Sequence, residues 1–176
     1  MPPNANPIPD KLINAAVYYE TDELLGMATV KLPELSYMSE NISGLGIAGE
    51  LETPVMGHFQ SITLALTWNT MTKDAVKLMQ TMSHQINVRA SIQRYDGASG
   101  KLESQAVKLV ANVMPKKTGM GKTEPGKKMD SETEMEASYL KLWIGGEEML
   151  EIDKFNFICR IMGKDMLSTV RADLGK

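Results

Sequence analysis

The fold is decided by residues 61–68, which read SITLALTW. Every second position of this stretch carries a large apolar side chain: Ile62, Leu64, Leu66 and Trp68. Successive side chains of a β-strand point to opposite faces, so this two-residue period predicts a strand with one buried face. The stretch therefore predicts that the domain is built around a β-sheet core.

The same alternation recurs along the chain and predicts further strands. These are residues 13–19, 27–32, 85–94, 102–114, 132–144 and 149–162. The sequence DGASG and the pair Gly145-Gly146 separate neighbouring runs and are typical of hairpin turns.

One helix is predicted over residues 73 to about 82, with Thr72 as its N-cap. Four apolar positions follow the i, i+3, i+4, i+7 spacing of a buried helical stripe: Ala75, Leu78, Met79 and Met82. About seven antiparallel strands and one helix predict a mainly β (α+β) fold, a packed antiparallel β-sandwich.

Residues 1–176 are expected to form a single domain, because a chain of this length can bury a core of its own. Three segments fall outside the predicted core. Residues 1–12 form a Pro-rich extended arm, residues 39–60 a Gly-rich loop, and residues 115–130 a mobile loop rich in lysine and glycine.

Composition excludes several classes of protein. The net charge of −3 and the pI near 5.5 argue against a nucleic-acid binder. The single cysteine, Cys159, cannot form a disulfide within the chain and is expected to be a buried small apolar residue. No signal segment or membrane-spanning apolar run is seen, so the protein is expected in the cytoplasm after synthesis.

Residues 44–49, GLGIAG, match the letters of the dinucleotide-binding fingerprint G-x-G-x-x-G. That fingerprint needs a buried strand before it and a helix after it, and here Pro54 and Gly57 interrupt any helix. The sequence GMGKT in the lysine-rich segment lacks the first glycine of a phosphate loop, since Lys116 stands at that position. A nucleotide-dependent enzyme is therefore kept only as the weakest of three hypotheses, and the other two are given below.

Catalytic and metal-binding patterns are absent from the sequence. His58 and His84 lack metal-ligand spacing with cysteine or paired acids. His58 lies in a predicted loop and His84 just past the helix, so each is expected to be an ordinary surface or helix-end histidine. No catalytic residue, metal or cofactor is expected, and the protein is not expected to be an enzyme.

The Gly-rich segment at residues 39–60 is apolar and mostly uncharged, so it would promote aggregation if it were exposed on a monomeric domain. Packed against another copy, its glycines allow close approach while its apolar side chains become buried. We therefore expect it to be an inter-subunit or ring-stacking contact. The residues expected there are Ile42, Gly44, Leu45, Gly46, Ile47, Gly49, Leu51, Pro54, Val55 and Met56.

The order of these features resembles the major tail tube proteins of contractile-tailed bacteriophages (myovirus type). The resemblance is carried by Leu32-Pro33, by the I-x-G-x-G-x-x-G pattern at residues 42–49, and by the strand ending at Trp68. It continues in YLKLWIGGEEMLEIDKFN at residues 139–156 and in a D-x-L tail at residues 165–167.

This resemblance implies a structural subunit of the phage tail tube fold whose hexameric rings stack helically into a hollow inner tail tube. The tube lies inside a contractile sheath and is the conduit for DNA ejection, and DNA passes through its lumen without specific binding. The implied partners are further copies of the chain and the tail sheath, tape measure, baseplate and tail terminator proteins, with no membrane.

The implied location is the virion tail or a free tail-like particle, assembled in the host bacterial cytoplasm. The alternative left open is the tube of a phage-tail-like bacteriocin (tailocin) or of a related contractile injection system.

Overall fold

The computed structural model describes residues 8–26, 28–97 and 99–175 of the chain. Within them lie twelve strands and two short helices. In chain order these are β1 (Ile8–Tyr19), β2 (Glu23–Leu24), β3 (Ala28–Lys31), β4 (Tyr37–Ser43), β5 (Glu50–Phe59), β6 (Thr63–Trp68), α1 (Lys73–Lys77), β7 (His84–Asp96), β8 (Lys101–Gly119), β9 (Ser131–Ile144), β10 (Glu147–Asp153), β11 (Ile158–Ile161), β12 (Lys164–Asp165) and α2 (Ser168–Asp173).

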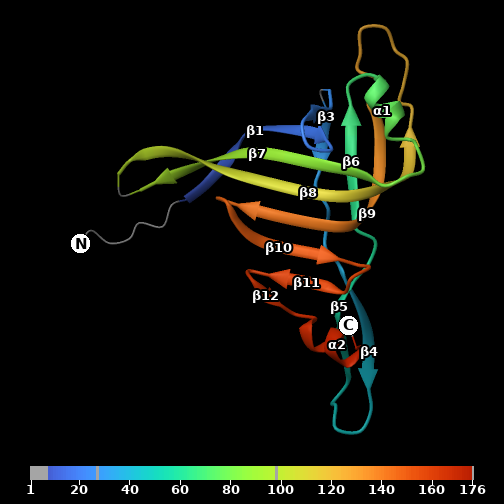
Figure 1. The fold of residues 1–176 in the computed structure, drawn as a ribbon, viewed down its shortest axis with the longest axis vertical. Helices are drawn as coiled ribbons and strands as arrows, with labels where there is room; N and C mark the ends of the chain where they lie inside the picture. Colours follow the sequence, from blue (N-terminus) through green and yellow to red (C-terminus); the bar gives the residue numbers. More distant parts are fainter. Residues whose placement is uncertain (1–7, 27, 98, 176) are drawn as a thin grey trace.

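Antiparallel strands form one large sheet in the order β12-β11-β10-β9-β8-β7-β1-β2, as Figure 1 shows. The pair β3-β6 joins this sheet through β9, and β4 and β5 form a separate two-stranded hairpin. β8 runs along one edge of β9 for most of its length. The other edge of β9 is shared, because β6 pairs with residues 131–136 and β10 pairs with residues 139–144. The sheet therefore splits at β9 into two walls.

Register shifts between β8 and β9 lie close to this split. Ser138 is an extra residue in β9 opposite the step from Asn112 to Val113, and Lys116 is an extra residue in β8 between Pro115 and Lys117. Such bulges bend a strand and increase its twist. They accompany the change of partner on β9 from β6 to β10.

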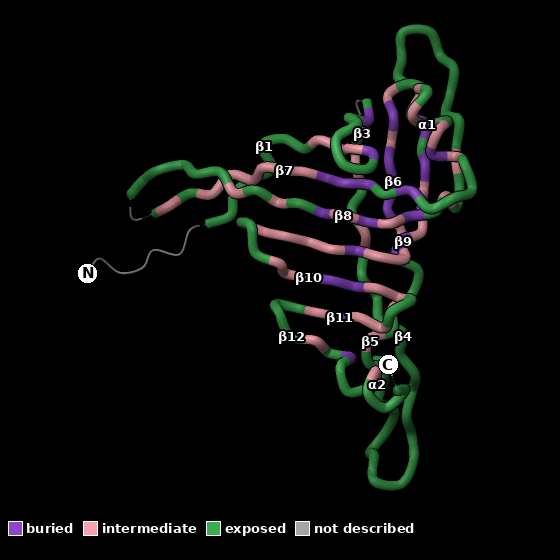
Figure 2. Tube along the Cα trace, viewed as in Figure 1, coloured by how far each residue is buried: buried purple, intermediate pink, exposed green. Residues whose placement is uncertain are grey.

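The hydrophobic core lies between β6 and the strands β1, β7, β8 and β9 at one end of the sheet (Figure 2). Ile62, Leu64, Leu66 and Trp68 are each at most 1% exposed, which confirms the predicted buried face of β6. They pack in one cluster with residues from the facing strands, such as Ile86 and Val113. The predicted mainly β fold class is confirmed.

The helix is shorter than predicted. α1 ends at Lys77 rather than near residue 82, and Met82 is half-exposed rather than part of a buried stripe. The predicted N-cap is present, because the Thr72 hydroxyl accepts a hydrogen bond from the backbone N–H of Ala75 at 3.2 Å. The chain must leave the helix early because β7 already begins at His84.

Of the two expectations for His84, a surface or a helix-end histidine, the surface position is wrong, since its side chain is 1% exposed. Its Nε2–H donates to the Gln80 carbonyl at 2.9 Å. Its Nδ1 accepts from the Tyr19 hydroxyl at 3.2 Å. Both ring nitrogens are therefore satisfied inside the protein, so this histidine ties β1 to the segment after α1.

The predicted return strand over residues 149–162 is two strands, β10 and β11. The Asp153 carboxylate accepts hydrogen bonds from the backbone N–H groups of Phe155 and Asn156, each at 3.0 Å, which stabilises a turn between them. At the end of the chain, the segment after residue 165 forms the short helix α2, which was not predicted.

The three predicted non-core segments have more regular structure than expected. β8 continues to Gly119, so the lysine-rich loop shortens to residues 120–130. Most of residues 39–60 lie in the strands β4 and β5 instead of a loop. Of the Pro-rich arm, residues 1–7 lie outside the described residues, and residues 8–12 are the first part of β1.

The core position of Leu64 gives a stability prediction. We expect Leu64→Ala to lower the free energy of unfolding by about 2–5 kcal/mol, because it leaves a cavity in a fully packed core. Urea denaturation measures this change. Leu45→Ala is the matched control, since the Leu45 side chain is fully exposed and its truncation should leave the monomer's stability unchanged. Equal effects of the two substitutions would contradict the assignment of the core.

Candidate assembly interface

The hairpin formed by β4 and β5 projects from one end of the molecule (Figure 1). Residues 44–49 connect its strands. The backbone φ angles of Gly44, Gly46 and Gly49 are 148°, 97° and 118°, a region that favours glycine. The GLGIAG sequence thus makes a hairpin connection, and the next element along the chain is the strand β5 rather than a helix. The features that would allow these glycines to bind a dinucleotide are missing.

The two faces of this hairpin differ in chemistry. Ile42 lies directly opposite Leu51, and these side chains are 47% and 53% exposed. The alternate pairs, Asn41 with Glu52 and Ser43 with Glu50, occupy the other face and are polar. The hairpin is therefore amphipathic near its turn, where Ile42 and Leu51 stay about half-exposed within the described residues, and toward its base the same face carries the pair Glu40 and Thr53.

The two arms of the hairpin are joined at its base, and the base also contacts the domain at Leu167. The rings of Tyr37 and Phe59 lie 4.8 Å apart, and the Gln60 backbone N–H donates to the Ser36 carbonyl at 2.9 Å. Gly57 has a φ of 65°, and a Cβ built there would come within 2.5 Å of the buried Leu167 side chain. The base of the hairpin is thus packed on the domain, whereas the Leu45 side chain at its tip is fully exposed.

A second unpaired surface lies along β1. One edge of β1 pairs with β7, and on the other edge only Tyr18 and Tyr19 pair, with β2. Within the described residues, the rest of that edge has no strand beside it. Ile8, Leu12 and Ile13 are each more than half-exposed on this segment. Beside the edge runs a groove of about 460 Å³, lined by residues that include Ala15, Ala16, Leu24 and Lys128.

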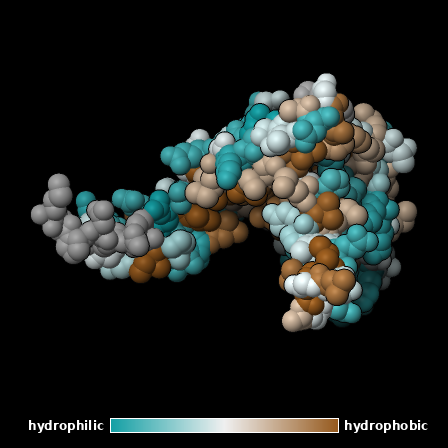
Figure 3. All heavy atoms as spheres, turned by 90° about the horizontal axis from the view of Figure 1, so that it is seen from below, coloured by the Kyte–Doolittle hydropathy of each residue, from teal (hydrophilic) through white to brown (hydrophobic). Residues whose placement is uncertain are grey.

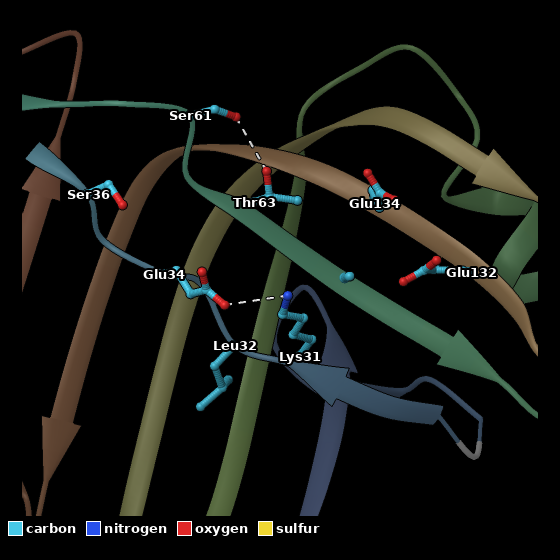
Figure 4. A pocket seen from close by; sticks show the side chains of 9 residues that line it. Lys31, Leu32, Glu34, Ser36, Ser61, Thr63, Glu132 and Glu134 are labelled. Carbon is cyan, nitrogen blue, oxygen red and sulfur yellow. Dashed lines mark hydrogen bonds and ion pairs between the residues drawn. The ribbon is translucent and has the colours of Figure 1, made fainter. Parts of the chain in front are cut away.

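A polar cleft of about 300 Å³ lies on the face of β6 and β9 opposite the core (Figure 4). Glu34, Glu132 and Glu134 line it. Glu34 pairs with Lys31 at 3.4 Å, and Glu134 pairs with Lys117 at 3.0 Å. These ion pairs neutralise two of the carboxylates. The residues that line the cleft do not place a catalytic nucleophile beside a general base. The arrangement is that of a solvated sheet face.

Next to this cleft, Glu136 ties three segments together. Its carboxylate accepts hydrogen bonds from the Ser61 hydroxyl and the Ile62 backbone N–H, and it pairs with the Lys154 ammonium at 2.8 Å. Partial burial raises the pKa of this carboxyl, but the hydrogen bonds from Lys154, Ser61 and Ile62 outweigh that effect and hold the pKa below its ordinary value.

A second charge network crosses the sheet from β9 to β11. The buried carboxylate of Glu151 accepts a hydrogen bond from the Tyr139 hydroxyl at 2.9 Å and pairs with the Arg160 guanidinium at 2.7 Å. Lys141 lies 3.5 Å from the same carboxylate. Burial, together with the hydrogen bond to Glu151, raises the pKa of Tyr139 well above its usual range. The network is structural, because every charged member has a partner.

Candidate catalytic and metal-binding residues are not brought together. Among residues 8–26, 28–97 and 99–175, no group of three or more His, Cys, Asp and Glu side chains is arranged to hold a metal ion. His58 is an exposed residue of β5, where its Nδ1–H donates to the Met56 carbonyl at 2.9 Å. Cys159 is buried, as predicted, and burial raises the pKa of its thiol, which lowers its reactivity.

Comparison with known proteins identifies the family. Residues 9–175 match the phage tail tube protein FII family. The chain belongs to this family. Its members are structural tail tube proteins and not enzymes, so the predicted resemblance is confirmed.

Individual relatives agree with this assignment. The tail tube protein of Escherichia phage P2 is 26% identical over 175 residues, which cover 96% of this chain and 98% of that protein. Among solved structures, a sheath/tube terminator from an extracellular contractile injection system (PVC), in the extended state, shares the fold with a TM-score of 0.52. It is 16% identical, and the match covers 77% of this chain and 96% of that one.

The chain is therefore a tail tube protein of the phage type, located in a phage tail or phage-like tail particle. In the part of the chain that the structure describes, no helix has the length and apolar character needed to cross a membrane.

The structure gathers the ten sequence-predicted contact residues on the hairpin. Ile42 lies in β4, the residues from Gly44 to Gly49 connect the strands, and the residues from Leu51 to Met56 lie in β5. Sequence reasoning missed the free edge of β1. No local pattern signals this edge, because it follows from the strand order of the sheet, and β1 itself is bulged opposite β7 at Asp10 and Ile13.

The Glu136 contacts predict a stability change on the acid side. Because the folded-state pKa lies below its ordinary value of 4.5, this carboxylate stabilises the fold above that pH. The contribution is lost as the pH falls through the folded-state value. We expect Glu136→Gln to flatten the fall in the free energy of unfolding below pH 4.5, measured by urea denaturation at several pH values. Glu103→Gln, at an exposed residue, should keep the wild-type profile. Identical profiles for wild type and Glu136→Gln would contradict the prediction.

Proposed function

We propose that this chain forms hexameric rings that stack into a hollow inner tail tube within a contractile sheath, the conduit for DNA ejection. The observation that carries the proposal is the uncovered hairpin of β4 and β5, in a chain that belongs to the tail tube family. The proposed partners are the tail sheath, tape measure, baseplate and tail terminator proteins, besides further copies of the chain.

The hairpin supports assembly because it gains little stability alone. A two-stranded hairpin is marginal in water unless its apolar face packs against something. Here all seven residues of β4 are exposed, and hydrophobic residues gather at the hairpin end of the molecule in the view from below (Figure 3). A neighbouring subunit would cover Ile42, Leu51 and Val55, which are each more than 40% exposed in the single chain.

The free edge of β1 supports lateral contact between copies. An open strand edge is a template for pairing with another chain, and closing a sheet into a barrel removes such edges. We propose that this edge of β1 meets a different surface of the neighbouring copy in the ring, which makes the contact heterologous and leaves the hairpin for contacts between rings. A heterologous contact makes a ring when its rotation closes. We therefore assign the β1 edge to contacts within the ring.

The passage of DNA without specific binding is supported by charge. The net charge of −3 gives little attraction for phosphate, and the release of counterions that drives nonspecific binding requires basic surface. The tailocin alternative uses the same subunit chemistry. The shared fold with a terminator of an injection system keeps that alternative open. Genes for a capsid near the gene for this chain would favour a phage.

The proposal predicts self-assembly of the purified protein. We expect concentrated protein to form hollow rings or tubes with six-fold end views, seen by negative-stain electron microscopy. If no assemblies form, the same experiment is repeated with a baseplate fraction as initiator. A particle that stays monomeric with the initiator present would contradict the proposal.

The apolar face of the hairpin should control assembly without controlling folding. We expect the double substitution Ile42→Thr and Leu51→Thr to abolish tubes while leaving the circular dichroism spectrum and the melting temperature of the monomer unchanged. Threonine keeps the strand propensity and removes apolar surface. The matched control is Asn41→Thr with Ser43→Thr, on the opposite face of the same hairpin. Normal tubes from the variant with Ile42→Thr and Leu51→Thr would contradict the assignment of this hairpin face to an assembly contact.

A further inference from the structure

Two projecting segments mark opposite ends of the longest axis of the molecule (Figure 1). One is the β4–β5 hairpin, and the other is the loop of residues 120–130 between β8 and β9. Both extend beyond the packed core and are exposed along their length (Figure 2). Any stacking of copies along this axis would bring the hairpin of one copy to the loop of the next.

The two ends carry opposite charge. The hairpin, residues 37–59, contains three glutamates and no lysine or arginine, a net charge of −3. The loop of residues 120–130 carries Lys122, Lys127 and Lys128 against Glu124 and Asp130, a net charge of +1. Lys127 pairs with Glu124 at 2.6 Å, whereas Lys122 and Lys128 form no salt bridge among the described residues.

The acidic side chains of the hairpin are also available for a partner. Glu40 and Glu50 are exposed and form no salt bridge within residues 8–26, 28–97 and 99–175, and Glu52 accepts a hydrogen bond from the Ser39 hydroxyl. Each end also presents apolar surface next to its charges. Leu45 at the hairpin tip is fully exposed, and Met120 at the start of the loop is 70% exposed. The ends are therefore complementary in charge and alike in offering a hydrophobic contact.

We infer that the β4–β5 hairpin of one copy docks on the loop of residues 120–130 of a second copy in the next ring. This inference rests on the proposed function, because it assigns the axial contact between rings. Contact between two hairpins, or between two loops, would oppose like charges. The hairpin-to-loop contact is heterologous and repeats along the axis without closing, which produces a stack with one direction.

Charge complementarity can make the contact between rings specific even though the contact made by each subunit is weak. An exposed ion pair contributes little by itself, and salt screens it. A ring repeats the pair in every subunit, so the linked contacts act together. Stacking should therefore be more sensitive to ionic strength than the lateral contacts, which involve the apolar edge of β1.

The test uses charge reversal in the full chain. One variant carries Lys122→Glu and Lys127→Glu, which makes both ends acidic. The second carries Glu40→Lys and Glu50→Lys, which changes the net charge of the hairpin, residues 37–59, from −3 to +1, so that both ends are basic. Lys128 is left unchanged because it also lines the groove beside β1. A control with Lys101→Glu and Lys164→Glu changes two other exposed lysines that form no salt bridge in the described part of the chain.

We expect each charge variant alone to form rings that do not stack, with at least a tenfold loss of tube protein pelleted by ultracentrifugation. An equimolar mixture of the two variants, and the chain carrying all four substitutions, should form tubes again. The control should form tubes as the wild type does. Wild-type tubes should separate into rings as the salt concentration is raised.

Three results would overturn the inference. These are normal tubes from both charge variants, loss of rings together with tubes, and failure of the mixture to restore tubes. Failure of the proposed function would look different, because the wild type itself would then form neither rings nor tubes under any condition.

Discussion

The structure depends on the shared edge of β9. Because β6 and β10 both pair with this edge, the sheet divides into two walls, and β8 on the opposite edge holds the walls together. The core forms where β6 turns back over β1 and β7. The strands β10, β11 and β12 continue from the other half of β9 and carry the charge network around Glu151. The long hairpin is connected to β6, so its position also depends on this division.

Much of the core could be predicted from the sequence because burial imposes a period that is visible in one dimension. The alternation of Ile62, Leu64, Leu66 and Trp68 identified both the strand and its buried face. The end of α1 and the turn at Asp153 could not be predicted in the same way. Both depend on local hydrogen bonds and on where the next strand must begin, and neither changes the apolar pattern.

The hairpin was predicted to be a contact site because its composition is abnormal for an exposed segment. The sequence showed that its apolar residues needed cover, but not that Ile42 and Leu51 lie on one face, because that requires the register of two strands. The free edge of β1 depends on the strand order of the sheet. The charges of the hairpin and the loop can be read from the sequence. Their placement at opposite ends of the molecule cannot, because no local pattern contains it.

The close approach of Gly57 to Leu167 ties the hairpin to the C-terminal segment. Leu167 is buried and directly precedes α2, so the hairpin base packs on a segment that is far from it in the sequence. A Cβ atom at residue 57 would overlap the Leu167 side chain, so any larger residue there must displace the hairpin or the start of α2. The direction in which the hairpin projects is therefore fixed together with the packing of the C-terminal helix.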